Sequence, residues 1–169
     1  WTNDPNGLIY LDGEYHLFYQ YNPFGNQWGH MSWGNAVSKD LFAWEHLPVA
    51  IPEAGSVMAF SGTAVFDRDN TSGFGTAEVP PLIAVYTGHQ AGREDKRIAY
   101  SIDRGRTFTQ FGGNPAIDLN VAEFRDPKVF WHTPTKRWIM VVALATEKKA
   151  LFYSSDDLKS WNKISEFGP

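Results

Sequence analysis

Hydrophobic residues in this chain recur mostly at every second position or in short apolar runs, and Gly, Pro, Asn and Asp separate these runs. Helical periodicity is weak throughout, so the pattern predicts short β-strands joined by turns. The predicted strands are Gly7–Leu11, Glu14–Gln20, Ser32–Ser38, Gly62–Phe66, Leu82–Tyr86, Arg97–Ser101, Lys128–Trp131, Arg137–Leu144 and Ala150–Ser154. Asp12-Gly13 separates the first two strands and favours a two-residue hairpin turn. The sequence therefore predicts an all-β fold.

A short pattern of Ser-x-Asp, a turn and a large aromatic residue occurs three times. The copies begin with Ser38-Lys39-Asp40, Ser101-Ile102-Asp103 and Ser154-Ser155-Asp156, and they end at Trp44, Phe108 and Trp161. Their spacing of roughly 50–60 residues, with several short strands in each unit, is typical of the blades of a β-propeller. Propellers close with typically about 4–8 blades. The chain is therefore expected to hold about three blades of an unclosed propeller.

The composition of the chain argues against several classes of function. The chain has 169 residues, of which 43% are hydrophobic and 20% charged, and its formal net charge is -4. It shows no basic stripe for nucleic acid and no apolar run of the ~18 residues that a membrane helix needs, so neither partner is expected. Cysteine is absent and the five His are dispersed, so no metal site and no cofactor are expected. Oligomeric state stays open.

Two segments could carry chemistry. Trp1–Gly7 contains Asp4 among turn-forming residues, and its composition alone favours a turn. Phe124–Pro127 contains Asp126 beside Arg125, which is the usual composition of a surface ion pair. Propeller strands nearest the axis converge, however, and would bring both carboxylates to one pocket. Paired carboxylates are the equipment of glycoside hydrolysis, and aromatic and amide side chains suit a sugar.

Five motifs, in this order, resemble glycoside hydrolase family 32, the invertases, inulinases and levanases. They are Trp1–Gly7 (W-x-N-D-P-N-G), Phe18–Pro23 (F-Y-Q-Y-N-P), Trp28–Gly34 (W-G-x-x-x-W-G), Phe60–Ala64 (F-S-G-[ST]-A) and Phe124–Phe130 (F-R-D-P-K-V-F). The sequence of Tyr153–Pro169 is also similar to that of the family. The resemblance implies a five-bladed propeller followed by a β-sandwich. Residues 1–169 would then be a partial N-terminal propeller, without the later blades and the sandwich.

The resemblance also implies roles for individual residues. Asp4 would be the catalytic nucleophile and Asp126 the transition-state stabiliser. The fructose-binding subsite would include Asn3, Gln20, Trp28, Phe60, Ser61 and Arg125. Asn3, Asn6 and Ser61 are candidates to donate hydrogen bonds to the nucleophile. Trp33 is predicted either to stack on the sugar or to pack between strands.

The implied reaction is hydrolysis of β-fructofuranosidic bonds in sucrose, inulin or levan, with retention of configuration. A retaining glycosidase needs a second carboxyl as general acid/base, which in this family is the Glu of a Glu-Cys motif. Residues 1–169 contain no Cys and hence no such motif. Glu123 and Glu166 do not match its position. The full-length protein is therefore expected to be a β-fructofuranosidase, and the isolated 169-residue chain to be inactive.

Two other functions fit parts of the sequence. Ser101–Phe108 resembles a sialidase Asp-box, although sialidases use a Tyr nucleophile and an arginine cluster that the motifs here do not suggest. A non-catalytic fructan-binding propeller would keep the sugar-binding residues. A plain scaffold propeller does not explain five ordered motifs. The family resemblance implies secretion and a fructoside as the partner molecule, and Asn70-Thr71-Ser72 is a glycosylation sequon consistent with secretion.

Overall fold

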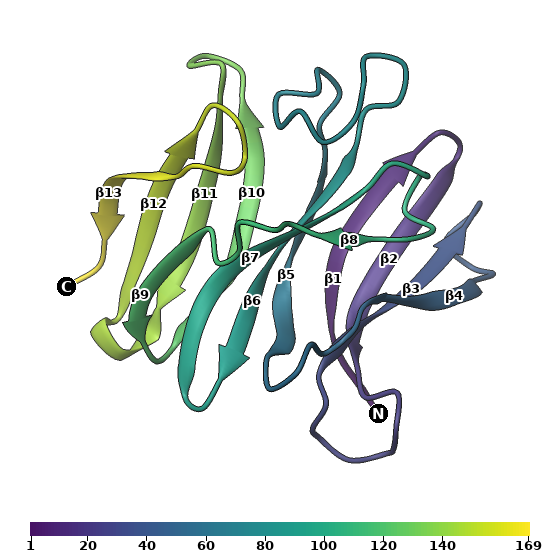
Figure 1. Cartoon of the computed structure of the whole chain (residues 1–169), viewed down its shortest axis with the longest axis horizontal. Coiled ribbons are helices and arrows are strands. Elements are labelled where there is room, and N and C mark those ends of the chain that lie inside the picture. The colour runs from purple at the N-terminus through teal and green to yellow at the C-terminus, as the bar shows by residue number, and fades with distance from the viewer.

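The computed structural model describes all 169 residues and contains three antiparallel sheets, each of which follows the chain order (Figure 1). The first sheet consists of β1 (Thr2–Leu11), β2 (Glu14–Tyr21), β3 (Ser32–Ser38) and β4 (Glu45–Ile51). The second consists of β5 (Met58–Phe66), β6 (Leu82–Gln90), β7 (Arg93–Ser101) and β8 (Thr109–Gln110), and β9 (Ile117–Val121) also pairs with β7. The third consists of β10 (Phe124–His132), β11 (Arg137–Leu144), β12 (Lys149–Ser155) and β13 (Asn162–Phe167). The one helical element is the short 3-10 helix η1 (Ala145–Glu147).

The first strands of the three sheets lie next to one another. β5 contacts β1 on one side and β10 on the other, while the later strands of each sheet lead away from this line (Figure 1). A meander that runs outward from a shared line of first strands is the architecture of propeller blades. The prediction of an all-β chain with three blades is therefore confirmed. No helix of the structure is long and apolar enough to cross a membrane.

Two apolar cores join the blades, and β6 contributes to both. Leu82, Ala84 and Tyr86 belong to the core shared with the first blade, whereas Ile83 and Val85 belong to the core shared with the third. Alternate residues of a strand point to opposite faces of its sheet, so the second blade is covered on both sides. The continuous apolar run Leu82–Tyr86 in the sequence is the signature of this double burial.

The predicted strands are all present, but four strands were missed. β8, β9 and β13 are short or largely exposed, and every residue of β13 is exposed. β4 contains Pro48, and only its last two residues are buried. An exposed outer strand needs no apolar alternation, so its sequence carries little strand signal.

The turn that composition favoured for Trp1–Gly7 is wrong, because β1 includes Thr2–Gly7. This half of the strand is irregular, with register shifts between Thr2 and Pro5 and between Asn6 and Ile9. Gly7 has φ +52, and a Cβ there would lie 2.7 Å from Ala64 Cβ on β5. The turn-forming residues thus produce bulges in an inner strand, and Gly7 allows this strand to approach the neighbouring blade closely.

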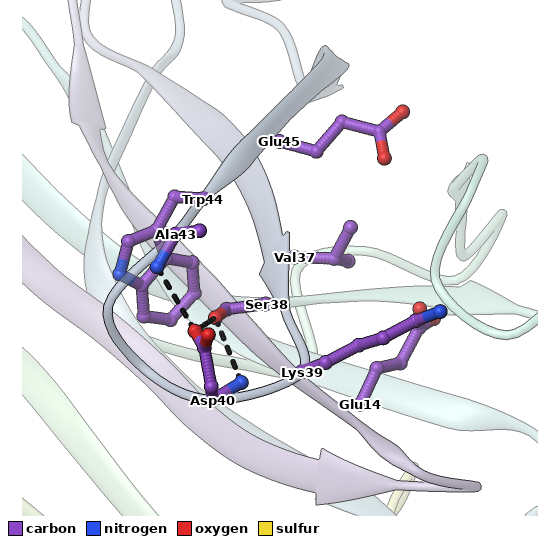
Figure 2. A pocket seen from close by; sticks show the side chains of 8 residues that line it. All are labelled: Glu14, Val37, Ser38, Lys39, Asp40, Ala43, Trp44 and Glu45. Atoms are coloured by element: carbon purple, nitrogen blue, oxygen red, sulfur yellow. Dashed lines mark hydrogen bonds between the residues drawn. The ribbon is translucent and has the colours of Figure 1, made fainter.

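The repeated Ser-x-Asp pattern forms a similar turn in all three blades. Ser38 Oγ donates to Asp40 Oδ1 at 3.1 Å, and the Asp40 carboxylate accepts the N–H of Ala43 (Figure 2) and also that of Phe42. In the second blade, where the turn is one residue longer, Asp103 accepts the N–H groups of Arg106 and Thr107. The residue after each aspartate, namely Leu41, Arg104 or Leu158, has a positive φ of 59–69°. The repeated sequence pattern therefore corresponds to a turn that recurs in each blade.

The third copy begins one residue later than predicted. Ser155, not Ser154, is the last residue of β12, and its Oγ lies 3.1 Å from Asp157 Oδ1. Asp156 instead forms an exposed ion pair with Arg137 at 3.0 Å. The reason is geometric, since the serine that ends the strand places the aspartate two positions later over the turn N–H groups, as in the other two blades.

Replacement of Asp157 by Ala is expected to destabilise the protein by about 1–2 kcal/mol, because it removes the acceptor for the Lys159 and Ser160 N–H groups. Asp156→Ala is the matched control and is expected to cost less than about 1 kcal/mol, because it removes only an exposed ion pair. Urea unfolding of the full-length protein measures both. An equal or larger loss in Asp156→Ala would contradict this assignment of the turn.

Candidate active site

One cavity of about 190 Å³ opens where the inner strands of the three blades meet. It is lined by Asn3, Asp4, Gln20, Trp28, Met31, Phe60, Ser61, Arg125 and Asp126. Each blade contributes a pair of adjacent residues from its first strand, and the first blade adds Gln20 and the β2–β3 loop. All eight site residues predicted from the sequence lie in this cavity. Met31 was missed, although it lies inside the Trp28–Gly34 motif, because an apolar side chain gave no chemical signal.

Asp4 is oriented by Ser61. Ser61 Oγ donates to Asp4 Oδ2 at 2.9 Å, whereas Asp4 Oδ1 accepts no hydrogen bond from the protein. A register shift between Phe60 and Gly62 places Ser61 at an irregularity of β5, and Gly62 packs so closely on β6 that a Cβ would lie 2.1 Å from Val85 O. One carboxylate oxygen of Asp4 is therefore fixed and the other is left for a ligand.

The other two candidate donors for Asp4 behave differently. Asn6 is buried, and its Oδ1 accepts the Gly62 N–H at 3.3 Å. Asn6 therefore joins β1 to β5 instead of contacting the carboxylate. Asn3 lines the cavity without a hydrogen bond to Asp4. Of the three candidates, Ser61 is the one that the structure places on this group.

Asp126 occupies an unusual backbone conformation at the far side of the cavity. Its φ is +61°, in the left-handed region that a non-glycine residue rarely adopts, and its N–H donates to Thr87 Oγ1 at 3.1 Å. Desolvation by the surrounding blades raises the pKa of Asp126, opposed by the positive charge of Arg125, and the negative charge of Asp4 raises it further. The two carboxylates therefore interact electrostatically across the cavity.

Arg125 is held by carboxylates from behind the cavity. Its guanidinium donates to Glu94 Oε1 at 3.1 Å and also pairs with Glu123. The Glu94 side chain is only 2% exposed, and His89 Nδ1 lies 3.3 Å from the same Oε1. Arg125 therefore pairs with two glutamates and forms no direct ion pair with Asp126. Glu123, which does not match the position of the family's general acid/base, pairs with Arg125 and does not line the cavity.

An aromatic wall forms one side of the cavity. The rings of Trp28 and Phe60 lie edge to face at 6.2 Å, and His89 stacks on the outer face of Phe60 at 4.4 Å with 7° between the ring planes. Trp28 is 61% exposed, so its ring is accessible to a ligand. Trp33 is fully buried and donates from Nε1 to Phe60 O, which decides between its two predicted roles in favour of packing. Gln20 is fixed by a hydrogen bond from Nε2 to Ala59 O.

Neither Glu94 nor His89 was indicated by the sequence. Arg93–Arg97 is a run of five charged residues, which typically marks a solvated segment, yet Glu94, Asp95 and Lys96 are buried. Their burial depends on partners from other strands, as in the Arg125–Glu94 pair between β10 and β7. A single sequence does not show such pairings between blades.

Larger cavities occur elsewhere but lack this chemistry. A cavity of about 380 Å³ on the first blade is lined by Glu14, Lys39, Asp40, Trp44 and neighbouring residues (Figure 2). Its polar groups include Ser38 and Asp40, which are occupied within the repeated turn. No group of three or more His, Asp or Glu side chains converges in a way that could hold a metal ion. The smaller cavity between Asp4 and Asp126 is therefore the candidate active site.

Comparisons with known proteins agree with this placement. The levanase of Bacillus subtilis (strain 168) is 55% identical over 171 residues, which cover 99% of this chain and 25% of the levanase. The extracellular exo-inulinase of Aspergillus awamori is 44% identical over 195 residues, covering all of this chain and 36% of the relative. A structure of β-fructofuranosidase from Schwanniomyces occidentalis, complexed with fructosyl-erythritol, matches with a TM-score of 0.96 at 40% identity and covers 99% of this chain and 34% of that one.

The chain thus spans about a quarter to a third of the length of the relatives it matches. Its three sheets correspond to about three blades of the five-bladed propeller of these enzymes. The model of the glycosyl hydrolases family 32 N-terminal domain matches residues 1–169. The chain therefore belongs to glycosyl hydrolase family 32.

Proposed function

We propose that the protein containing this chain hydrolyses β-fructofuranosidic bonds, with retention of configuration at the anomeric carbon. The observation that carries the proposal is the meeting of Asp4 and Asp126 at one cavity that also holds an aromatic wall and fixed polar groups. The names of the relatives, levanase and exo-inulinase, support fructans as substrates. Sucrose, inulin and levan are the substrates to assay. The label of the exo-inulinase as extracellular supports secretion as part of the same proposal.

Asp4 is the proposed nucleophile. Its free Oδ1 attacks the anomeric carbon of the fructosyl unit, the glycosidic bond breaks, and the leaving oxygen takes a proton from a general acid. Water then attacks the same carbon, the ester bond to Asp4 breaks, and the conjugate base of the acid accepts the proton of the water. Two inversions at one carbon give net retention. The hydrogen bond from Ser61 keeps the carboxylate in the attacking orientation.

Asp126 is the proposed stabiliser of the transition state. As the glycosidic bond breaks, positive charge develops on the fructosyl ring, and a carboxylate that accepts hydrogen bonds from ring hydroxyls stabilises that charge. Arg125, Asn3 and Gln20 supply further polar contacts from the cavity wall. Trp28 and Phe60 present ring surfaces to the apolar C–H groups of the sugar.

The reaction also requires a general acid/base. Glu94 and Glu123 contact the cavity residue Arg125, and both carboxyl groups are paired with its guanidinium. Neither is free to exchange a proton with a leaving group. Activity is therefore tested in the full-length protein that contains this chain.

Replacement of Asp4 by Asn is expected to lower kcat by about 10³-fold or more while the fold and fructose binding persist, because the amide cannot form the fructosyl ester. Asp12→Asn, in the exposed β1–β2 turn, is the matched control and is expected to keep normal activity. Release of fructose from sucrose, inulin and levan measures the rates. Near-normal turnover by Asp4→Asn would remove this residue from the nucleophile role.

Replacement of Ser61 by Ala is expected to lower kcat roughly 10- to 100-fold with a smaller change in KM. The reason is the loss of the one hydrogen bond that orients Asp4, since bonds to charged groups contribute about 1.5–3 kcal/mol. Ser61→Thr, which keeps a hydroxyl, is the companion variant and is expected to recover part of the rate. An unchanged kcat in Ser61→Ala would show that Asp4 is positioned without this bond.

A further inference from the structure

A buried lysine lies directly beneath the candidate active site. Lys96 on β7 has no exposed surface, and its ammonium group makes three hydrogen bonds. Nζ donates to Thr87 Oγ1 at 3.2 Å, to Asp95 O at 2.9 Å and to Phe124 O. It also lies over the Phe124 ring, 4.3 Å from the centroid. All three acceptors are neutral oxygens, so the ammonium forms no direct ion pair and its charge is available to act on the cavity.

Two of these acceptors lead to Asp126. Thr87, on β6, is fully buried, and its Oγ1 accepts both the Lys96 ammonium and the Asp126 N–H. A hydroxyl oxygen has two lone pairs, so Lys96 fixes one of them and leaves the other pointing at the Asp126 N–H. Phe124 lies two residues before Asp126. Lys96 therefore binds the carbonyl at the start of the segment Phe124–Asp126, and Thr87 binds the N–H at its end.

This segment needs such support because its backbone departs from regular strand geometry. The pairing of β10 with β11 shifts register between Arg125 and Lys128, which removes Asp126 from the ladder. The φ of +61° at Asp126 is also unfavourable for a residue with a Cβ. A strained conformation persists only where its surroundings determine it. Lys96 and Thr87 contact the backbone of this segment from the second blade, at Phe124 O and at the Asp126 N–H.

We propose that Lys96 and Thr87 are positioning residues that hold Asp126 in its left-handed conformation and so direct its carboxylate into the cavity. Lys96 additionally places a positive charge below that carboxylate. The kinetic part of this inference rests on the proposed function, whereas the effect on the Asp126 backbone does not.

The charge of Lys96 acts together with several titratable groups. Those acting on the Lys96 ammonium or the Asp126 carboxyl are Glu94 and Asp95 on β7, Arg125 on β10 and Asp4 on β1. His89 on β6 contacts Glu94. Burial lowers the pKa of Lys96 to about 7, opposed by the negative charges of Glu94, Asp95 and Asp126. Below that pH the lysine is protonated, and its charge lowers the pKa of Asp126. Loss of the charge should therefore raise the pKa of Asp126.

The hydroxyl of Thr87 is tested by two variants of the full-length protein. Thr87→Val keeps the shape but removes the acceptor of the Asp126 N–H, so kcat should fall about 10-fold or more with a smaller change in KM. Thr87→Ser keeps the hydroxyl and should stay within about 3-fold of the wild type. Thr63→Val, at another buried threonine on β5, controls for the loss of any buried hydroxyl and should keep its activity. Equal activity of Thr87→Val and Thr87→Ser would overturn the positioning role.

The charge of Lys96 is tested separately. Lys96→Gln keeps hydrogen-bond donors but removes the charge, and the acid limb of its kcat/KM profile should move to higher pH by about half a unit or more. Lys96→Met removes both and should also lower kcat about 10-fold or more. If Lys96→Met does not fold, Lys96→Gln still decides the question of charge. An acid limb that stays in place in Lys96→Gln would overturn that part of the proposal.

A readout without turnover separates this inference from the proposed function. If the wild type releases no fructose from sucrose, inulin or levan, the proposed function fails, but crystal structures of Thr87→Val and Thr87→Ser still report the Asp126 backbone. The inference predicts that Asp126 leaves the left-handed region in Thr87→Val and keeps it in Thr87→Ser. An unchanged φ in Thr87→Val would overturn the inference whatever the activity.

Discussion

The close packing of β5 between β1 and β10 is the constraint on which the candidate site depends. Asp4, Ser61 and Asp126 lie on three different sheets, and nothing within one sheet brings any two of them together. Contact between the inner strands does so, and it requires small residues at the crossing points. Gly7 on β1 faces Ala64 on β5 at a distance that leaves no room for a Cβ, and within the second blade Gly62 on β5 packs equally closely on Val85 of β6. A larger residue at Gly7 would separate the first two blades and thereby Asp4 from Ser61.

The inner strands contain several residues and backbone conformations that disfavour regular β-structure. They include Pro5 and Pro127, several register shifts and a left-handed aspartate. Proline and glycine weaken a regular ladder, and residues with positive φ cost conformational energy. Such local conflicts are concentrated at functional sites and are stabilised by the surrounding fold. Here the surroundings are the second blade, whose β6 is buried on both faces and whose β7 carries the buried charges behind Arg125 and Asp126.

The sequence predicted the structure best where a single physical requirement, such as burial or a turn conformation, determines the residue type. Double burial produced the continuous apolar run of β6, and the repeated turn needed an aspartate at a fixed place, so both could be predicted. The eight cavity residues were found through motifs of a resembling family, whereas composition alone favoured a turn for Trp1–Gly7. The burial within the charged run Arg93–Arg97 could not be predicted, because it depends on partners such as Arg125, 31 residues from Glu94 in the sequence. The third turn was placed one residue too early because the sequence there is Ser154-Ser155-Asp156-Asp157. Either serine fits the pattern, and only the position at which β12 ends, Ser155, decides between them.

The order of strands within each sheet has a consequence for how the cavity comes into being. Each blade is a meander of strands that are consecutive in the chain, so its hydrogen bonds join segments that are close in sequence and can form early in folding. The cavity, by contrast, belongs to no blade and exists only while three blades pack against one another. Because both apolar cores are also shared between blades, the cavity forms together with those cores and is lost when the blades separate. Catalytic competence in such an architecture reports on docking between units more sensitively than any measure of strand content.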